Sequence, residues 1–247
     1  MIKNLLIAFL ILTGLAAKAQ NKMQAVNELI NNTDPGWPIV KEWIESAKNK
    51  VEVLTADSAK AKDALFKIQV TTRSPMGSVV YMTGGILVDD GWIRILGSGN
   101  PMLNRSLPDW NKGKSLVKFG EASPFLLIAD DAVGGFYLLN GGGLGKDLGK
   151  VYYFSPENLT YEPLGITYSN FLQFCFNSNL DKFYKGLRWT NWKNEVSKLA
   201  GDKVFSFYPY LWTREGKNIK KNTRNIVPIE EQYNLNCDMR KQLGLDK

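Results

Sequence analysis

Apolar residues along the chain follow two kinds of spacing, and the change between them divides the sequence into three parts. A spacing of three to four residues predicts helices at residues 23–30, 35–47 and 58–68. Helical spacing returns at residues 170–176 and continues after Asp181, Thr190 and Pro228. Between these parts, short continuous apolar runs predict strands at residues 79–81, 86–88, 92–96, 125–129, 136–139, 151–154 and 159–166. This order predicts an α+β fold, in which N-terminal and C-terminal helices flank a central, mostly antiparallel sheet.

Turn residues separate the predicted strands. Asp90-Gly91 lies between two apolar runs and predicts a hairpin, because a type I′ turn needs positive φ at both central residues. A glycine-rich stretch at residues 140–149 separates the last two central strands. Pro209 interrupts the aromatic run at residues 204–212, so we expect an edge strand or a packed loop there.

The first nineteen residues have the composition of a signal peptide. Lys3 precedes an apolar run at residues 5–15, and Ala17-Lys18-Ala19 is a cleavage sequence of the A-x-A type. The run is short for a membrane span, although a retained anchor is the alternative interpretation. We expect residues 1–19 to be cleaved, residues 20–247 to form a single globular domain, and the mature protein to be periplasmic or secreted, without stable membrane anchoring.

The balance of charged residues adds little to the prediction of function. The chain has 31 basic and 24 acidic residues, which is mildly basic and does not indicate nucleic-acid binding. Its clearest basic cluster, between residues 214 and 224, is interpreted as a solvated loop or, alternatively, as a contact for an acidic partner. The cluster consists of Arg214, Lys217, Lys220, Lys221 and Arg224.

Two residue types limit the chemistry. The chain contains no histidine, which excludes Ser-His-Asp and Cys-His catalysis and the usual zinc sites. We therefore expect no metal and no cofactor. The two cysteines, Cys175 and Cys237, both lie in apolar helical patterns, so the sequence leaves open whether they form a disulfide or remain thiols.

The glycine-rich stretch does not match a nucleotide-binding motif. Neither the phosphate-loop spacing nor the dinucleotide-binding spacing is complete, so a hairpin connection is predicted. Carboxylates at 89, 90, 130, 131 and 157 are the candidates for acid–base chemistry or calcium binding. Turn formation is the competing explanation for them, because Asp bonds its own backbone in turns. The candidate binding residues are Arg73, Asp130, Asp131, Gly134, Gly135, Asn140, Gly141 and Gly142.

Several segments together resemble a bacterial domain-of-unknown-function family, number 2625, over nearly the whole mature chain. They include residues 69–77, 91–99, 129–142, 151–159, 168–172, 183–189 and 206–213. A second, fold-level resemblance covers residues 128–172, which are similar to the core of the SMI1/KNR4-like (SUKH) superfamily. That likeness implies a non-catalytic α+β module, of the kind used as immunity proteins, that binds proteins on a concave sheet face.

The main hypothesis is therefore an exported, non-catalytic module that binds a protein or peptide. One alternative is a histidine-free hydrolase that acts on polysaccharide or peptidoglycan through Asp and Tyr residues. Another is a protein that binds a small ligand or calcium. Two carboxylates facing each other across a cleft would favour the hydrolase.

Overall fold

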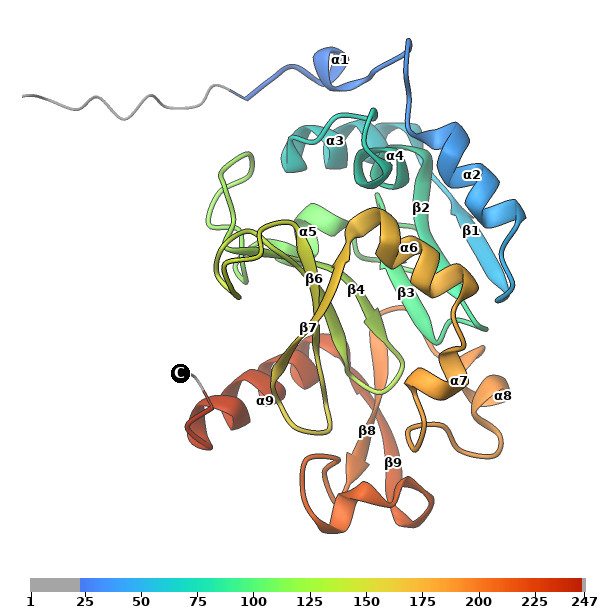
Figure 1. The fold of residues 1–247 in the computed structure, drawn as a ribbon, viewed down its shortest axis with the longest axis vertical. Coiled ribbons are helices and arrows are strands. Elements are labelled where there is room, and N and C mark those ends of the chain that lie inside the picture. Colours follow the sequence, from blue (N-terminus) through green and yellow to red (C-terminus); the bar gives the residue numbers. More distant parts are fainter. Residues whose placement is uncertain (1–22, 246–247) are drawn as a thin grey trace, which may run out of the picture.

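Seven β-strands form one sheet at the centre of the structure, a computed structural model that describes residues 23–245 (Figure 1). Each strand pairs antiparallel with the next one in sequence, so the spatial order runs from β1 to β7 without a crossover. The strands are β1 (Val51–Thr55), β2 (Thr83–Val88), β3 (Ile93–Leu96), β4 (Phe125–Asp131), β5 (Phe136–Asn140), β6 (Lys150–Phe154) and β7 (Tyr161–Thr167). The α+β class and the antiparallel sheet are confirmed. The predicted signal peptide, residues 1–19, lies outside the described residues.

The hairpin between β2 and β3 has the predicted turn. The N–H of Trp92 donates to the carbonyl of Asp89 at 3.1 Å, and the two residues between them, Asp90 and Gly91, have φ values of 59° and 84°. These are the positive values that a type I′ turn requires. Asp89 also has a positive φ, of 54°.

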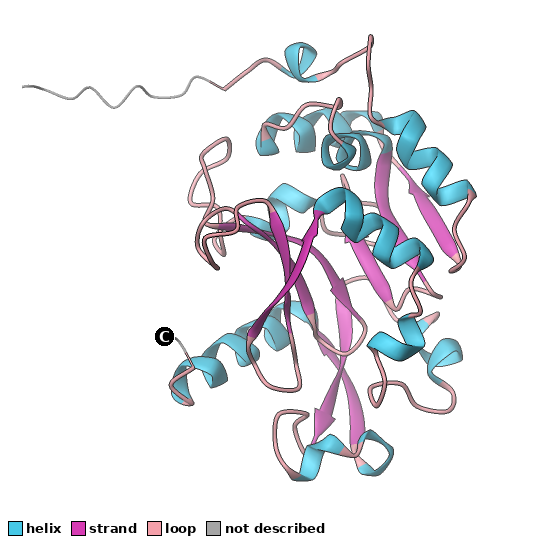
Figure 2. Ribbon diagram, in the orientation of Figure 1, coloured by secondary structure: helices cyan, strands magenta, loops and turns pink. Residues whose placement is uncertain are grey.

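One face of the sheet is covered by the N-terminal helices and by the helices that follow β7 (Figure 2). Tyr137 of β5 packs against Phe171 of α6, with ring centroids 4.8 Å apart. Helix α4 packs on β2 and contacts both α2 and α6. The helices of this region are α1 (Val26–Leu29), α2 (Trp37–Glu45), α3 (Ser58–Ile68), α4 (Pro75–Met82), α6 (Tyr168–Asn177), α7 (Leu180–Phe183) and α8 (Trp192–Val196).

The other face carries the C-terminal elements. Side chains alternate along a strand, so Phe136 points to the opposite face of the sheet from Tyr137. The ring of Phe136 packs edge-to-face on that of Tyr233, with centroids 5.0 Å apart. Tyr233 belongs to α9 (Ile229–Gln242), and α5 (Leu107–Asn111) lies beside it. Both faces of the central strands are therefore covered, so the concave sheet face that the SUKH resemblance implies is not open.

A second, two-stranded sheet extends from the body. Strands β8 (Lys203–Tyr208) and β9 (Thr223–Pro228) pair antiparallel, and two short 3-10 helices, η1 (Glu215–Lys217) and η2 (Ile219–Lys221), lie between them. We call residues 203–228 the C-terminal lobe. Figure 1 shows its tip at the end of the molecule opposite α1.

Several local predictions were wrong. Residues 79–81 were predicted as a strand but lie in α4, which begins with Ser74 as N-cap and Pro75 in its first turn. The helix expected from Pro35 begins at Trp37. Strands β1 and β9 were not predicted at all, because their exposed polar residues break the apolar runs.

Candidate functional site

Asp130, a predicted binding residue, is the centre of a buried ion cluster. Its side chain is fully buried, with Oδ1 2.5 Å from Arg94 Nη2 and Oδ2 2.7 Å from Arg105 Nη1. Arg94 also donates to the carbonyl of Lys203 at 2.6 Å, and Arg105 donates to that of Gly201 at 2.8 Å. Asp130 therefore ties β3 and β4 to the base of the C-terminal lobe and is not accessible to a ligand.

Asp131 points to the opposite face of the sheet, and its carboxylate makes no ion pair with any residue that the structure describes. Its Oδ1 accepts hydrogen bonds from the N–H groups of Val133 at 3.0 Å and Gly135 at 2.8 Å, and its Oδ2 accepts one from the hydroxyl of Tyr153 at 2.7 Å. Burial raises the pKa of Asp131, although these three donors act to lower it. The side chain closes the β4–β5 turn, which is the structural role that turn chemistry suggested.

The paired glycines of this turn are required by packing. Gly134 has a φ of 83°, and a Cβ there would lie 2.7 Å from the side chain of Gln232 on α9. A Cβ on Gly135 would lie 2.2 Å from the hydroxyl oxygen of Tyr153. Both contacts are too close for any larger residue, so these glycines shape the turn and do not form a ligand cradle.

The glycine-rich stretch is a hairpin connection between β5 and β6, as predicted. Asn140 organises it: Oδ1 accepts from the N–H groups of Gly142 and Leu144, and Nδ2 donates to the carbonyl of Gly145 at 2.9 Å. A Cβ on Gly141 would lie 2.0 Å from the carbonyl oxygen of Ser123. The polar groups of this loop are thus engaged within the loop and its neighbours.

Arg73 and the two cysteines lie apart from this region. Arg73 is exposed and makes an ion pair with the equally exposed Asp34 at 3.2 Å. Cys175 is buried in α6 and Cys237 is partly buried in α9, and no disulfide joins them. Of the two states that the sequence left open, the structure has the thiols. Burial raises the pKa of Cys175 well above its ordinary value, so this thiol stays protonated.

The remaining candidate carboxylates do not share a pocket with the acidic pair. Asp89 makes an ion pair with Arg188 at 2.6 Å, and Asp90 makes one with Lys50 at 2.6 Å. Glu157 is exposed at the surface, and partial desolvation raises its pKa. Asp89 and Asp90 line one hollow, but each is held in an ion pair, so the structure does not present them as a free acid–base pair facing each other across a cleft.

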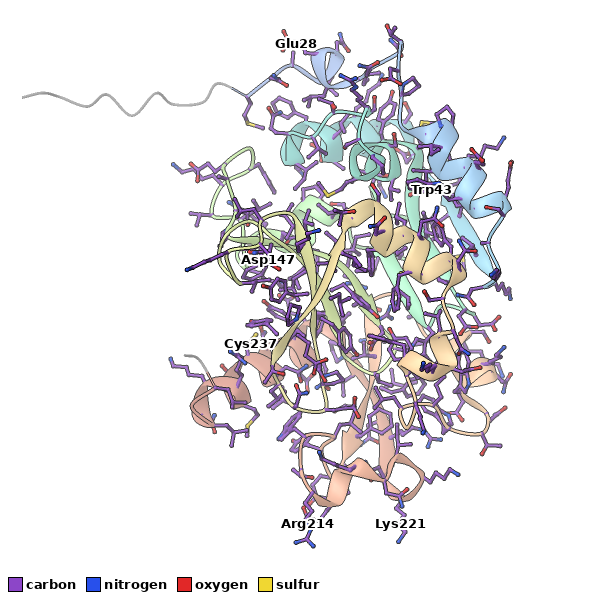
Figure 3. The ribbon with its side chains drawn as sticks, viewed as in Figure 1. Glu28, Trp43, Asp147, Arg214, Lys221 and Cys237 are labelled. Atoms are coloured by element: carbon purple, nitrogen blue, oxygen red, sulfur yellow. The ribbon has the colours of Figure 1, made fainter. Side chains whose placement is uncertain are left out.

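The basic cluster does gather on one surface, the tip of the C-terminal lobe. Arg214, Lys217, Lys220 and Lys221 are all exposed, and Glu215 is the one acidic residue among residues 209–222. Figure 3 shows Arg214 and Lys221 pointing outward from this tip. Arg224, the fifth predicted member, instead stacks on Trp189 at 4.6 Å and pairs with Glu195 at 3.3 Å, so it holds the lobe against the body.

Apolar side chains accompany this charge. Tyr208, at the end of β8, is 68% exposed, and Ile226 of β9 is 59% exposed. Beside Tyr208, whose ring centroid lies 6.1 Å from that of Tyr210, the rings of Tyr210 and Trp212 stack with their centroids 4.5 Å apart. The lobe thus combines cations that form no ion pair within the described residues with exposed aromatic and aliphatic surface. The sequence signalled this surface through the basic cluster and the aromatic run at residues 204–212.

The residues that the structure describes include neither a metal-binding cluster nor a helix that could span a membrane. Within residues 23–245, no group of three or more acidic or cysteine side chains is arranged to hold a metal ion. No helix in the same range has both the length and the apolar composition needed to cross a bilayer.

Comparison with known proteins places the chain among uncharacterised relatives. Residues 26–232 match the family described as "Protein of unknown function DUF2625". An uncharacterised protein of Haemophilus influenzae is 43% identical over 223 residues, which are 90% of this chain and 98% of that protein. An uncharacterised protein of Escherichia coli (strain K12), YbfG, is 40% identical over 219 residues, which are 89% and 98% of the two chains. These names assign neither an activity nor a ligand.

Proposed function

We propose that the chain, which belongs to the DUF2625 family of proteins of unknown function, is an exported, non-catalytic module that binds an acidic protein partner through its C-terminal lobe. Membership confirms the family resemblance seen in the sequence. Export rests on the signal-like sequence of residues 1–19 alone. The observation that carries the binding proposal is the projecting tip of the lobe, which is both basic and partly apolar.

The charge of the tip favours an acidic partner. Four cationic side chains stand against one carboxylate within a short segment, and none of the four makes an ion pair with a described residue. Such a surface speeds the encounter with a negatively charged surface and orients it. The exposed ring of Tyr208, with the ring of Tyr210 beside it, supplies the desolvated contact that charge alone does not provide.

The lobe is also preorganised, which lowers the entropy cost of binding. Asn222 is buried at its centre and donates to the carbonyls of Pro209 at 3.1 Å and Gly216 at 2.7 Å. Phe205 and Phe207 pack on Trp189 with ring centroids 5.0 and 5.9 Å away. A surface fixed in this way loses little freedom when a partner docks.

Catalysis is not favoured by the same structure. Asp130 and Asp131 are fully buried, and Asp89 is engaged by Arg188. With no histidine in the chain, an acid–base pair would have to come from other titratable groups, and Asp90, like Asp89, is already held in an ion pair. The SUKH-like immunity role stays a prediction. Because both faces of the central strands are covered, we assign the proposed contact to the lobe and not to the sheet.

The test is capture of a partner from periplasmic extract by the immobilised mature chain. The lobe variant replaces Arg214, Lys217, Lys220 and Lys221 with Glu. A matched variant makes the same charge change at four exposed lysines elsewhere, Lys41, Lys60, Lys62 and Lys118. We expect one stoichiometric acidic partner that the matched variant retains, and that the lobe variant loses by at least about tenfold.

Salt gives a second readout of the same proposal. Because the contact is electrostatic and exposed, capture by the unmodified chain should weaken as ionic strength rises. Equal capture by the lobe variant and the matched variant, or a partner that binds independently of salt, contradicts the proposal.

A further inference from the structure

Arg188, which the sequence analysis did not single out, is held between aromatic rings. Its guanidinium carbon lies 4.7 Å from the ring centre of Trp92, 4.1 Å from that of Trp192 and 5.3 Å from that of Tyr184. The side chain is only 8% exposed. Stacking of this kind fixes the plane of the guanidinium and therefore the direction of its N–H groups.

The two acidic partners of Arg188 differ in burial. Asp89 lies 2.6 Å from Nη2 and is itself mostly buried, in the β2–β3 turn. Asp181 accepts a hydrogen bond from Nη1 at 2.6 Å, but its side chain is 82% exposed. Asp89 is thus a fixed counter-ion, whereas Asp181 can leave Nη1 by rotating into water.

Arg188 is also less fully bonded than the buried arginines at Asp130. Its Nε is buried and has no hydrogen-bond partner among the described residues. In contrast, Arg94 donates from Nε, Nη1 and Nη2, to Asp130, Lys203 and Asp131 respectively. The Arg188 guanidinium therefore keeps hydrogen-bonding capacity that the described residues do not use.

A hollow of about 520 Å³ opens in front of this cluster. Four cationic side chains and three carboxylates line it, so one positive charge is left over. The carboxylate of Asp90 is engaged by Lys50, and Asn49, Asn177, Ser178 and Asn179 supply uncharged polar groups. The charged lining residues are Lys48, Lys50, Arg188, Lys193, Asp89, Asp90 and Asp181.

The geometry points to a binding site in this hollow for a small monoanionic carboxylate that also carries hydroxyl groups, such as a sugar acid. The ligand's carboxylate replaces that of Asp181 and accepts the hydrogen bond that Nη1 of Arg188 now donates to Asp181. Lys193, which is exposed and 4.0 Å from Asp89, lies on the rim and adds attraction. Hydroxyl groups of the ligand meet the Ser178 hydroxyl and the amide oxygens of the Asn side chains, since the amide nitrogens of Asn49 and Asn177 already donate within the protein.

The surplus of one positive charge selects the charge of the ligand. A monoanion neutralises the hollow, whereas a dianionic phosphate would face repulsion from Asp89 and Asp90 at close range. This site is distinct from the lobe tip and does not depend on the proposed protein partner.

The test is titration of the full mature chain with glucuronate, glucose 6-phosphate and glucose, followed by calorimetry and by tryptophan fluorescence, since Trp92 and Trp192 stack on Arg188. Asp181→Asn removes the competing charge at an exposed position, so the fold is retained. It should bind glucuronate about tenfold more tightly than the unmodified chain. Lys193→Gln should bind it severalfold more weakly. Asp34→Asn is the matched control, because it frees an exposed arginine, Arg73, that has no stacked rings, and it should change nothing.

Four outcomes overturn the proposal. They are glucose binding as tightly as glucuronate, glucose 6-phosphate binding more tightly than glucuronate, an Asp181→Asn affinity no higher than that of Asp34→Asn, and no binding of any probe to Asp181→Asn.

Discussion

The segment at residues 128–154 and the C-terminal lobe use charge in opposite ways. In the central segment, Asp130 and Asp131 are fully buried, and every oxygen of their carboxylates is bonded inside the protein. In the lobe, four cations reach solvent from a short loop. The aspartates that were candidates for catalysis or binding therefore stabilise the fold, because a strand buries them. The basic loop of the lobe is the better candidate for binding a partner.

The two regions are nevertheless connected. Asp130 orients Arg94 and Arg105, and these two arginines donate to the carbonyls of Lys203 and Gly201 at the base of the lobe. The buried carboxylate therefore acts on the exposed surface by positioning it. The following predictions test this contrast, from the largest expected effect to the smallest.

Loss of the Asp130 carboxylate should have the largest effect. Asp130→Ala leaves two buried guanidinium groups without a counter-ion, and we expect the free energy of unfolding to fall by about 3–5 kcal/mol. Urea denaturation measures this. Glu215→Ala, which removes an exposed carboxylate from the lobe, is the control and should change stability by less than about 0.5 kcal/mol. A similar loss of unfolding free energy in both variants would contradict the claim that the buried carboxylate stabilises the fold and the exposed one does not.

Gly135→Ala should have an intermediate effect. The added Cβ would meet the Tyr153 hydroxyl oxygen at 2.2 Å, and overpacking of this kind costs about 1–3 kcal/mol. In the background of Tyr153→Phe, which lacks that oxygen, the same substitution should cost less, although Asp131 Oδ2 still lies 2.4 Å from the Cβ position. A double-mutant cycle in urea checks the coupling, and purely additive effects would show that this contact is not the cause.

Asp131 should give a smaller effect that depends on pH. Because burial raises its pKa in the folded state, the folded chain holds the proton more tightly than the unfolded chain does. The stabilising contribution is present below the unfolded pKa of about 3.9 and is lost as pH rises through the folded value. Asp131→Asn lacks this loss, so its stability relative to the unmodified chain should increase between about pH 4 and pH 7. A difference that stays constant with pH would contradict the raised pKa.

Much of this fold could be predicted from local patterns. The helix at residues 58–68 was found because its apolar stripe is regular, and the structure adds Asp57 as its cap. Strands β4 to β6 were found because their apolar runs are continuous. Helix α4 was missed because Val79-Val80-Tyr81 has strand-like composition, although Ser74 and Pro75 signal a helix start.

The candidate sites were harder to predict because they depend on contacts between distant residues. Trp92 and Arg188 are almost a hundred positions apart in the sequence, and no local spacing connects them. Burial of Asp130 likewise depends on Arg94 and Arg105 from other segments. The basic cluster could be seen in the sequence, but its projection from the body depends on the pairing of β8 with β9. That pairing was not predicted, because exposed polar residues interrupt the apolar pattern of β9.

Site-specific photo-crosslinking in cells compares the two regions most directly. Tyr208 on the lobe and Leu148 on the glycine-rich loop are both 68% exposed, so a photoreactive phenylalanine analogue is equally accessible at either position. A protein-binding lobe predicts one discrete crosslinked protein from position 208 and none from position 148. A discrete crosslink from position 148, with none from position 208, would place recognition on the central segment and contradict the proposed function.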